Sequence, residues 1–242
     1  MAKFRRAIVV GGTSGLGYEL VLQLLQRKCR VAAIGRNIDS LKPLQRVHGD
    51  LLISVEHDVR DYSMVPELFQ QLCGELDGLD LIIYCAGLMP PVAINEFDFE
   101  KDLGMIETNV SGAVAWINQA ALRFQNTRRG TIVGIGSVAG DRGRAGQPVY
   151  NASKAFLHVY LESVRNRLAK HRVRVTSIKP GPMATNMTAH LDQRKMMTVD
   201  EAATRVLKLA GKQGEFYLNW KHMVAMAIIK RLPGWVLRRI RL

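Results

Sequence analysis

Apolar runs of four to seven residues alternate along the chain with longer stretches in which apolar residues recur every three or four positions. Most of the runs lack the alternation of apolar and polar residues that marks a strand with one solvent-exposed face, so they predict strands buried on both faces of a parallel sheet. Strands and helices alternate without a linker or a repeat, which predicts one doubly wound α/β domain with a seven-stranded parallel sheet and helices on both faces. The predicted strands are 7–10, 30–35, 51–55, 79–84, 130–136, 173–178 and 215–219, and the predicted helices are 18–28, 61–72, 107–125, 148–170 and 198–210.

The composition of the chain indicates the size of its core and its cellular compartment. The chain has 242 residues, 48% hydrophobic and 23% charged, which suffices for a substantial core in one domain. No apolar run approaches the roughly 20 residues that cross a bilayer. The three cysteines, Cys29, Cys73 and Cys85, form no CxxC pair or even framework, which favours reduced thiols. We therefore expect a cytoplasmic protein.

The first predicted strand runs into a glycine-rich turn, GGTSGLG at 11–17, and a helix follows. Strand, turn and helix in this order are typical of a nucleotide-binding site, because the free N–H groups of a helix N-terminus bind phosphate. Gly11 permits the tight turn, Gly15 lets the backbone approach a pyrophosphate, and Gly17 lets helix and strand pack closely. The Gly-x-x-x-Gly-x-Gly spacing differs from the more widely quoted dinucleotide fingerprint.

Arg36 follows the end of the second predicted strand. An acid at this point would bind the ribose 2′-hydroxyl of NAD, whereas an arginine suits the 2′-phosphate of NADP. The next acid along the chain is Asp39. The position of Arg36 therefore predicts NADP(H) as the cofactor.

Tyr150 and Lys154 stand one turn apart if the stretch is helical, on the same helix face. A nearby ammonium favours the phenolate form of a tyrosine, so the pair can exchange a proton with a carbonyl or alcohol oxygen. Ser137 follows the fifth predicted strand, at the sheet edge where open α/β sheets bind ligands. Asn109 is a poor helix former inside a predicted helix, which indicates a role beyond packing.

These features together resemble the short-chain dehydrogenase/reductase family, in its single-domain form with a Tyr-x-x-x-Lys pair, over about residues 5–219. The resemblance implies a Rossmann fold, Tyr150 as general acid/base, Lys154 as its partner and a ligand of the nicotinamide ribose, Ser137 as holder of the substrate oxygen, and Asn109 as anchor of a water in a proton relay. The cofactor-binding residues it implies, with those of the turn and of Arg36, are Gly11, Thr13, Ser14, Gly15, Leu16, Gly17, Arg36, Asp58, Val59, Ala86, Gly87, Tyr150, Lys154, Pro180, Gly181 and Met183.

Two positions depart from the family pattern. Val10 stands where the family usually has Thr, and Tyr84-Cys85 stands where it usually has Asn-Asn before Ala-Gly. Both positions stabilise the turn and the strand, so the departure concerns local hydrogen bonds and not the chemistry.

The predicted function is NADP-dependent reduction of a ketone or aldehyde, or oxidation of the corresponding alcohol, without a metal. The alternative is a non-catalytic NADP-binding sensor or scaffold of the same fold, which the retained Ser, Tyr and Lys disfavour. A loop with Arg142 and Arg144 could meet a phosphate or carboxylate, or be a solvated charged loop. A partly lipophilic small-molecule substrate, such as a lipid-linked one, is favoured by an apolar set: Leu88, Met89, Pro91, Val92, Val138, Met183 and Met187.

The final stretch, 220–242, lies beyond the predicted catalytic domain of 1–219 and holds six basic residues and no acid, leaving +7 of the net charge of +13 to the rest. Trp, Met, Ile and Leu beside clustered Lys and Arg are typical of a segment lying in the interface of an anionic membrane, here the inner face. Packing on another subunit is the alternative. We expect no nucleic-acid partner, because no basic stripe appears elsewhere.

Apolar residues on the helices at about 109–125 and 150–169 exceed what one sheet face needs, which predicts a homodimer, or a tetramer. The residues concerned are Val114, Trp116, Phe156, Val159 and Leu161.

Overall fold

Seven parallel strands form a single sheet in the structure, a computed structural model that describes residues 4–189 and 192–239. The strands are β1 (Arg6–Val10), β2 (Arg30–Gly35), β3 (Leu52–Glu56), β4 (Leu81–Tyr84), β5 (Gly130–Ile135), β6 (Val173–Lys179) and β7 (Gly214–Tyr217). Their order is β3-β2-β1-β4-β5-β6-β7, so the direction of winding reverses between β1 and β4. This confirms the predicted doubly wound α/β fold, and such a reversal is where sheets of this kind bind ligands.

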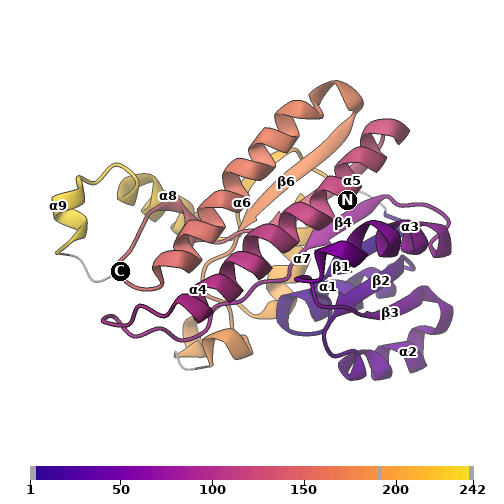
Figure 1. The fold of residues 1–242 in the computed structure, drawn as a ribbon, viewed down its shortest axis with the longest axis horizontal. Coiled ribbons are helices and arrows are strands. Elements are labelled where there is room, and N and C mark those ends of the chain that lie inside the picture. Colours follow the sequence, from indigo (N-terminus) through magenta and orange to yellow (C-terminus); the bar gives the residue numbers. More distant parts are fainter. Residues whose placement is uncertain (1–3, 190–191, 240–242) are drawn as a thin grey trace.

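The helices cover both faces of the sheet (Figure 1). They are α1 (Gly15–Gln26), α2 (Lys42–His48), α3 (Val65–Glu75), α4 (Phe99–Ile106), α5 (Gly112–Thr127), α6 (Pro148–Arg167), α7 (Val199–Leu209), α8 (Trp220–Ile229) and α9 (Gly234–Leu237). One core lies between the sheet and α3, α5 and α6, and the other between the sheet and α1, α2 and α7. Alternate residues of β1 enter opposite cores, Ile8 and Val10 one and Ala7 and Val9 the other, which explains the unbroken apolar run.

The helix around Asn109 begins earlier than the sequence pattern indicates. α4 starts at Phe99, with the carboxylate of Asp98 accepting hydrogen bonds from the N–H groups of Glu100 and Lys101. A π-helical segment, Glu107–Ser111, joins α4 to α5. Half of the residues of α4 are apolar, but of these only Met105 is buried and Phe99 is 71% exposed, so they form no continuous core-facing stripe that periodicity could reveal.

The two helices predicted to carry a dimer interface keep fewer apolar residues on the surface than expected. Trp116 and Leu161 are fully buried in the core beneath α5 and α6, so their assignment to an excess apolar surface was wrong. Phe156 and Val159 do face outward, with 39% and 63% exposure. Helical spacing alone did not show which apolar residues of α6 face the sheet and which face outward. The buried residues of this helix cover more than one third of its circumference, so a wide face is taken up by the core.

The chain after β7 returns to pack on its own domain. α8 and α9 lie at one end of the molecule (Figure 1, yellow), where α8 contacts β7 and the short helix 138–141. Met226 is buried, and a Cβ on Gly181 would lie 2.0 Å from the imidazole of His222, so α8 fits closely against the loop after β6. The last part of the predicted tail, 240–242, lies outside the described residues. No helix in the described ranges has the length and apolar character needed to cross a bilayer.

Candidate active site

A cavity of about 660 Å³ opens at the carboxyl ends of the strands. It brings together residues from the turns after β1, β2, β4, β5 and β6 and from the start of α6. Of the catalytic and cofactor-binding residues predicted from the sequence, those in its wall are Gly11, Thr13, Ser14, Gly15, Leu16, Gly17, Arg36, Asp58, Val59, Ala86, Gly87, Ser137, Tyr150, Lys154, Pro180, Gly181 and Met183. The wall also includes the predicted substrate-contacting residues Leu88, Met89, Val138, Arg144 and Met187, but not Pro91 or Val92. Asn109 is 1% exposed and lies behind this wall.

The glycine-rich turn leaves no room for side chains where the backbone segments meet. Gly11 has a φ of +84°, and a Cβ there would lie 2.5 Å from the backbone nitrogen of Ala86. A Cβ on Gly17 would lie 1.8 Å from the carbonyl oxygen of Gly11, so the close packing expected of Gly17 is present. Ser14 occupies the N-cap position of α1 without a side-chain capping bond, which leaves the first N–H groups of the helix available to a phosphate. This cradle fits a dinucleotide.

The far end of the cavity carries the charges that concern a 2′-phosphate. Arg36 is exposed in the cavity wall, and no carboxylate lies within 4 Å of it among the described residues. Asp39 instead forms an ion pair with Lys42, at 2.6 Å. Asp58 pairs with Arg60 at 2.7 Å, and this hydrogen bond is the main cause that lowers the pKa of Asp58 to about 2.

The residues predicted to transfer protons lie around the start of α6. Tyr150 is in the first turn of this helix, which begins at Pro148, and the ammonium of Lys154 lies 5.7 Å from the centre of the Tyr150 ring. Lys154 is 5% exposed, and its Nζ donates a hydrogen bond of 3.1 Å to the carbonyl of Ile135 at the end of β5. The strand therefore positions the ammonium beside the phenol. Ser137 follows β5 in an extended conformation, and its Oγ accepts a hydrogen bond from the N–H of Ala139.

Asn109 lies in the π-helical segment, a feature frequent at functional sites. Its amide binds both the N–H and the carbonyl of Leu88, at 2.7 and 2.9 Å, and donates to Oγ of Ser153 at 3.0 Å. Tyr84, one of the departures from the family pattern, donates from its hydroxyl to the carbonyl of Thr108 at 2.6 Å. Tyr84 thus holds the segment that positions Asn109 against the loop after β4.

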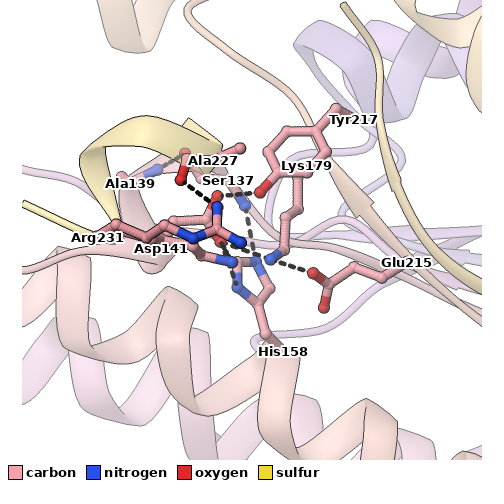
Figure 2. A network of polar contacts seen from close by, with 10 residues as sticks. Ser137, Ala139, Asp141, His158, Lys179, Glu215, Tyr217, Ala227 and Arg231 are labelled. Carbon is pink, nitrogen blue, oxygen red and sulfur yellow. Dashed lines mark hydrogen bonds and ion pairs between the residues drawn. The ribbon is translucent and has the colours of Figure 1, made fainter. Parts of the chain in front are cut away.

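A buried charged cluster, which the sequence did not reveal, lies directly behind Ser137 (Figure 2). Its centre is Asp141, whose side chain is 1% exposed and receives Lys179 at 2.5 Å and the hydroxyl of Tyr217 at 2.5 Å. Lys179 also pairs with Glu215, and Lys230 from the end of α8 reaches Asp141 at 3.3 Å. Burial alone would raise the pKa of Asp141, but these hydrogen bonds outweigh it and the pKa is lowered. The sequence does contain one signal of this cluster: Lys179, a lysine at the end of an apolar strand, next to Pro180.

His158 connects this cluster to Ser137. Its Nε2 accepts a hydrogen bond from the N–H of Ser137 at 3.4 Å, and its Nδ1 lies 3.9 Å from Asp141. The ring is wedged between two glycines, because a Cβ on Gly136 or Gly140 would come within 2.8 Å of it. Burial, followed by the charge of Lys179, lowers the pKa of His158 to about 3, so the imidazole is neutral at physiological pH and Nε2 can accept.

Comparison with known proteins agrees with this geometry. The family model described as short chain dehydrogenase matches residues 5–196. An uncharacterized oxidoreductase of Myxococcus xanthus is 39% identical over 241 residues, which cover 96% of this chain and 94% of that protein. Carbonyl reductase family member 4 of Danio rerio is 32% identical and covers 87% of this chain and 86% of its own length.

A solved structure supports the same relationship. A short chain dehydrogenase from Burkholderia cenocepacia, crystallised in complex with NADP, superposes with a TM-score of 0.85 at 26% identity, covering 98% of this chain and 97% of its own. The chain belongs to the short-chain dehydrogenase family, and it is an oxidoreductase of that family.

Proposed function

We propose that the protein is an NADP-dependent reductase of ketones or aldehydes. The observation that carries the proposal is the shared cavity: Arg36 lies at one end, Ser137, Tyr150 and Lys154 lie at the other, and the glycine-rich turn lies in the same wall. The carbonyl reductase relative and the NADP-bound neighbour support the reaction and the cofactor. The assignment of the site residues rests on their placement in this cavity.

We assign the following binding and catalytic roles to the residues of the cavity. The turn at 11–17 and the N-terminus of α1 hold the pyrophosphate, Arg36 binds the 2′-phosphate, and Lys154 binds the nicotinamide ribose. When bound, the reduced nicotinamide supplies a hydride, two electrons and one proton, to the carbonyl carbon. Ser137 holds the carbonyl oxygen, and Tyr150 gives it the second proton, so that an alcohol forms. Tyr150 regains its proton through Lys154 and a water held near Asn109.

The test of this chemistry is NADPH oxidation with a panel of keto-lipids and keto-sugars. Tyr150→Phe should lower kcat by about 10²–10⁴-fold, the range of general acid–base catalysis, and leave the Kd for NADPH nearly unchanged. Tyr160→Phe is the matched control on the same helix, since the Tyr160 hydroxyl bonds to Asn118 on α5. A Tyr150→Phe protein with more than about a tenth of the activity would contradict the role. Tight NADPH binding without turnover of any carbonyl would favour a sensor or scaffold.

The cofactor assignment is tested at Arg36. Arg36→Asp should abolish or reverse the preference for NADPH over NADH, because a carboxylate repels the 2′-phosphate. Arg46→Asp makes the same charge change at an exposed position of α2 and should leave the preference intact. Equal Kd values for NADPH and NADH in the unaltered protein would refute the assignment.

The outer surface of α5 and α6 supports a proposed homodimer or a larger oligomer. Leu122, Phe156 and Val159 are exposed there, by 57%, 39% and 63%. A second copy that covers this face would remove these apolar side chains from water. Light scattering at micromolar concentration should give at least twice the chain mass, and Val159→Glu should lower that mass. A monomer would contradict the proposal.

The tail supports a second proposal, reversible attachment to an anionic membrane surface. Five large apolar side chains of 220–239 are at least 46% exposed: Trp220, Met223, Val224, Ile228 and Trp235. They lie among Lys and Arg without a neighbouring acid in the sequence, as in a segment that binds an anionic interface. Co-sedimentation with anionic but not neutral vesicles should occur, and Trp220→Ser/Trp235→Ser should weaken it. Full-length protein that stays in the supernatant with anionic lipid at low salt would contradict it.

A further inference from the structure

One end of the catalytic cavity holds a guanidinium that no part of the proposed reaction uses. Arg144 lies in the cavity wall together with Ser137 and Tyr150, on the loop between the short helix 138–141 and α6. Across the described residues no carboxylate lies within 4 Å of it. A full positive charge therefore faces the substrate end of the cavity without compensation from the protein.

The other charged residues of this loop are turned elsewhere. Asp141 is saturated by Lys179, Tyr217 and Lys230 and is 1% exposed, so it cannot neutralise Arg144. Arg142 donates from Nη2 to the carbonyl of Leu232 in the tail. Of the two arginines, the cavity wall includes Arg144 and does not include Arg142.

The guanidinium is held in place by a buried neutral partner. Nη2 of Arg144 donates a hydrogen bond of 3.1 Å to Oδ1 of Asn151, which is 3% exposed. The amide of Asn151 also donates to the carbonyl of Gly146 at 2.9 Å, so one side chain fixes both the loop and the guanidinium. This anchor uses one donor of five, because no described residue accepts a hydrogen bond from Nε or Nη1.

A second polar atom in the same wall lacks a partner. Gln147 has a left-handed backbone, with φ +57°, at the residue before α6, and its amide nitrogen bonds to the carbonyl of Pro90 at 3.2 Å. Its Oε1 is buried, with no hydrogen-bond donor among the described residues. Buried polar atoms are nearly always paired, with protein, water or ligand, so the open donor of Arg144 and the open acceptor of Gln147 are available to a polar group beside the cavity.

We propose that Arg144 binds an oxyanion of the substrate, so that the protein reduces carbonyl compounds carrying a carboxylate or a phosphate group. The guanidinium suits both anions. The same cavity is also lined by Leu88, Met89, Val138 and Met187, which suit a hydrocarbon segment between the carbonyl and the anion. The proposal rests on the proposed reductase function and gives that site its substrate class.

The activity test compares each anionic substrate with its neutral counterpart. Linear oxo acids of increasing chain length are assayed beside their methyl esters, and dihydroxyacetone phosphate beside dihydroxyacetone, with NADPH. The unaltered protein should prefer one anionic series by about 10- to 100-fold in kcat/KM, the range of a charge-assisted hydrogen bond. The preferred series distinguishes carboxylate from phosphate. Arg144→Met should remove the preference, mainly through KM, and Arg144→Lys should keep part of it.

Arg142→Met is the matched control, since it removes the same charge from the same loop at a side chain outside the cavity wall. It should retain the preference. An unchanged Kd for NADPH shows that the Arg144→Met protein is folded. Equal kcat/KM values for the anionic and neutral substrates of the unaltered protein, or a preference that survives Arg144→Met, would overturn the proposal.

A binding measurement separates this proposal from the reductase function. Calorimetric titration of the NADP⁺-loaded protein with hexanoate and with inorganic phosphate needs no turnover. Saturable binding of one anion, lost in Arg144→Met and kept in Arg142→Met, would support the anion site even if none of the carbonyl compounds is reduced. Absence of binding of both anions together with reduction of the neutral ketones would refute the anion site and leave the reductase function standing.

Discussion

The two ends of the cavity are built in different ways. The phosphate-binding part of the cofactor end is one short stretch, 11–17, in which the absence of side chains lets three backbone segments approach one another. The substrate end is supported by a charged cluster whose members, Asp141, His158, Lys179, Tyr217 and Lys230, come from five elements spread over about 90 residues. The shape of the cofactor end depends on the absence of side chains from the turn. The shape of the substrate end depends on ion pairs and hydrogen bonds between buried charged side chains. Mutations should therefore damage the two ends by different physical mechanisms.

The largest effect is expected from an unpaired charge in the cluster. Asp141→Leu should lower the free energy of unfolding by about 3–5 kcal/mol, because it leaves the buried Lys179 with Glu215 alone. Adding Lys179→Met should restore a large part of the loss, since an apolar pair can replace a buried ion pair. Denaturant unfolding of the two single variants and the double variant measures the coupling. Additive losses would show that the two side chains act independently.

A smaller effect is expected from an added methyl group at the cofactor end. Gly17→Ala places a Cβ 1.8 Å from the carbonyl oxygen of Gly11 and should cost about 1–3 kcal/mol of stability, as overpacking does, and weaken NADPH binding. Gly74→Ala is the matched control in α3, where a Cβ meets nothing within 4 Å. It should stabilise the protein by about 0.5–1 kcal/mol. Chemical unfolding and NADPH titration of both variants test the contrast.

Through His158 the cluster should also make the stability of the protein depend on pH. The pKa of His158 is about 3 in the folded protein and near 6.5 when unfolded, so between these values the unfolded chain binds one more proton. Stability should fall as the pH falls from 6.5 toward 4, by about 1.4 kcal/mol per pH unit from this residue. Gln offers an acceptor to the Ser137 N–H but does not titrate, so His158→Gln should flatten the slope and retain kcat. An unchanged slope would contradict the assignment.

The smallest effect is expected at the rim of the cluster. Lys230 reaches Asp141 at 3.3 Å, but its side chain is 43% exposed. Lys230→Met should therefore lower stability by about 0.2–1 kcal/mol, the range of exposed ion pairs, and less at high salt. Unfolding curves at low and high salt measure this. A loss comparable to that of Asp141→Leu would show that the tail is an integral part of the cluster.

The sequence predicted the sheet because strands buried on both faces need unbroken apolar runs. The structure confirms seven strands, although the two edge strands, β3 and β7, are only partly buried. It also predicted seventeen catalytic and cofactor-binding residues that line one cavity, since they lie after a strand or in the first two turns of a helix. It missed α4, in which only Met105 is buried, and it placed Trp116 and Leu161 on the surface although both are in the core. Periodicity fixes which residues share a helix face, but not which neighbour covers that face.

What the sequence by itself determined was local: the turn at 11–17, the one-turn spacing of Tyr150 and Lys154, and the arginine after β2. The chemistry of these features depends on residues that are close together in the chain, so the sequence alone is enough to predict it. Tertiary structure alone decided that His158 accepts from Ser137, that Asp141 is sealed while Arg144 faces the cavity, and that one face of α8 packs on its own domain. These outcomes depend on contacts between residues far apart in the chain, because burial and charge pairing are properties of the assembled fold.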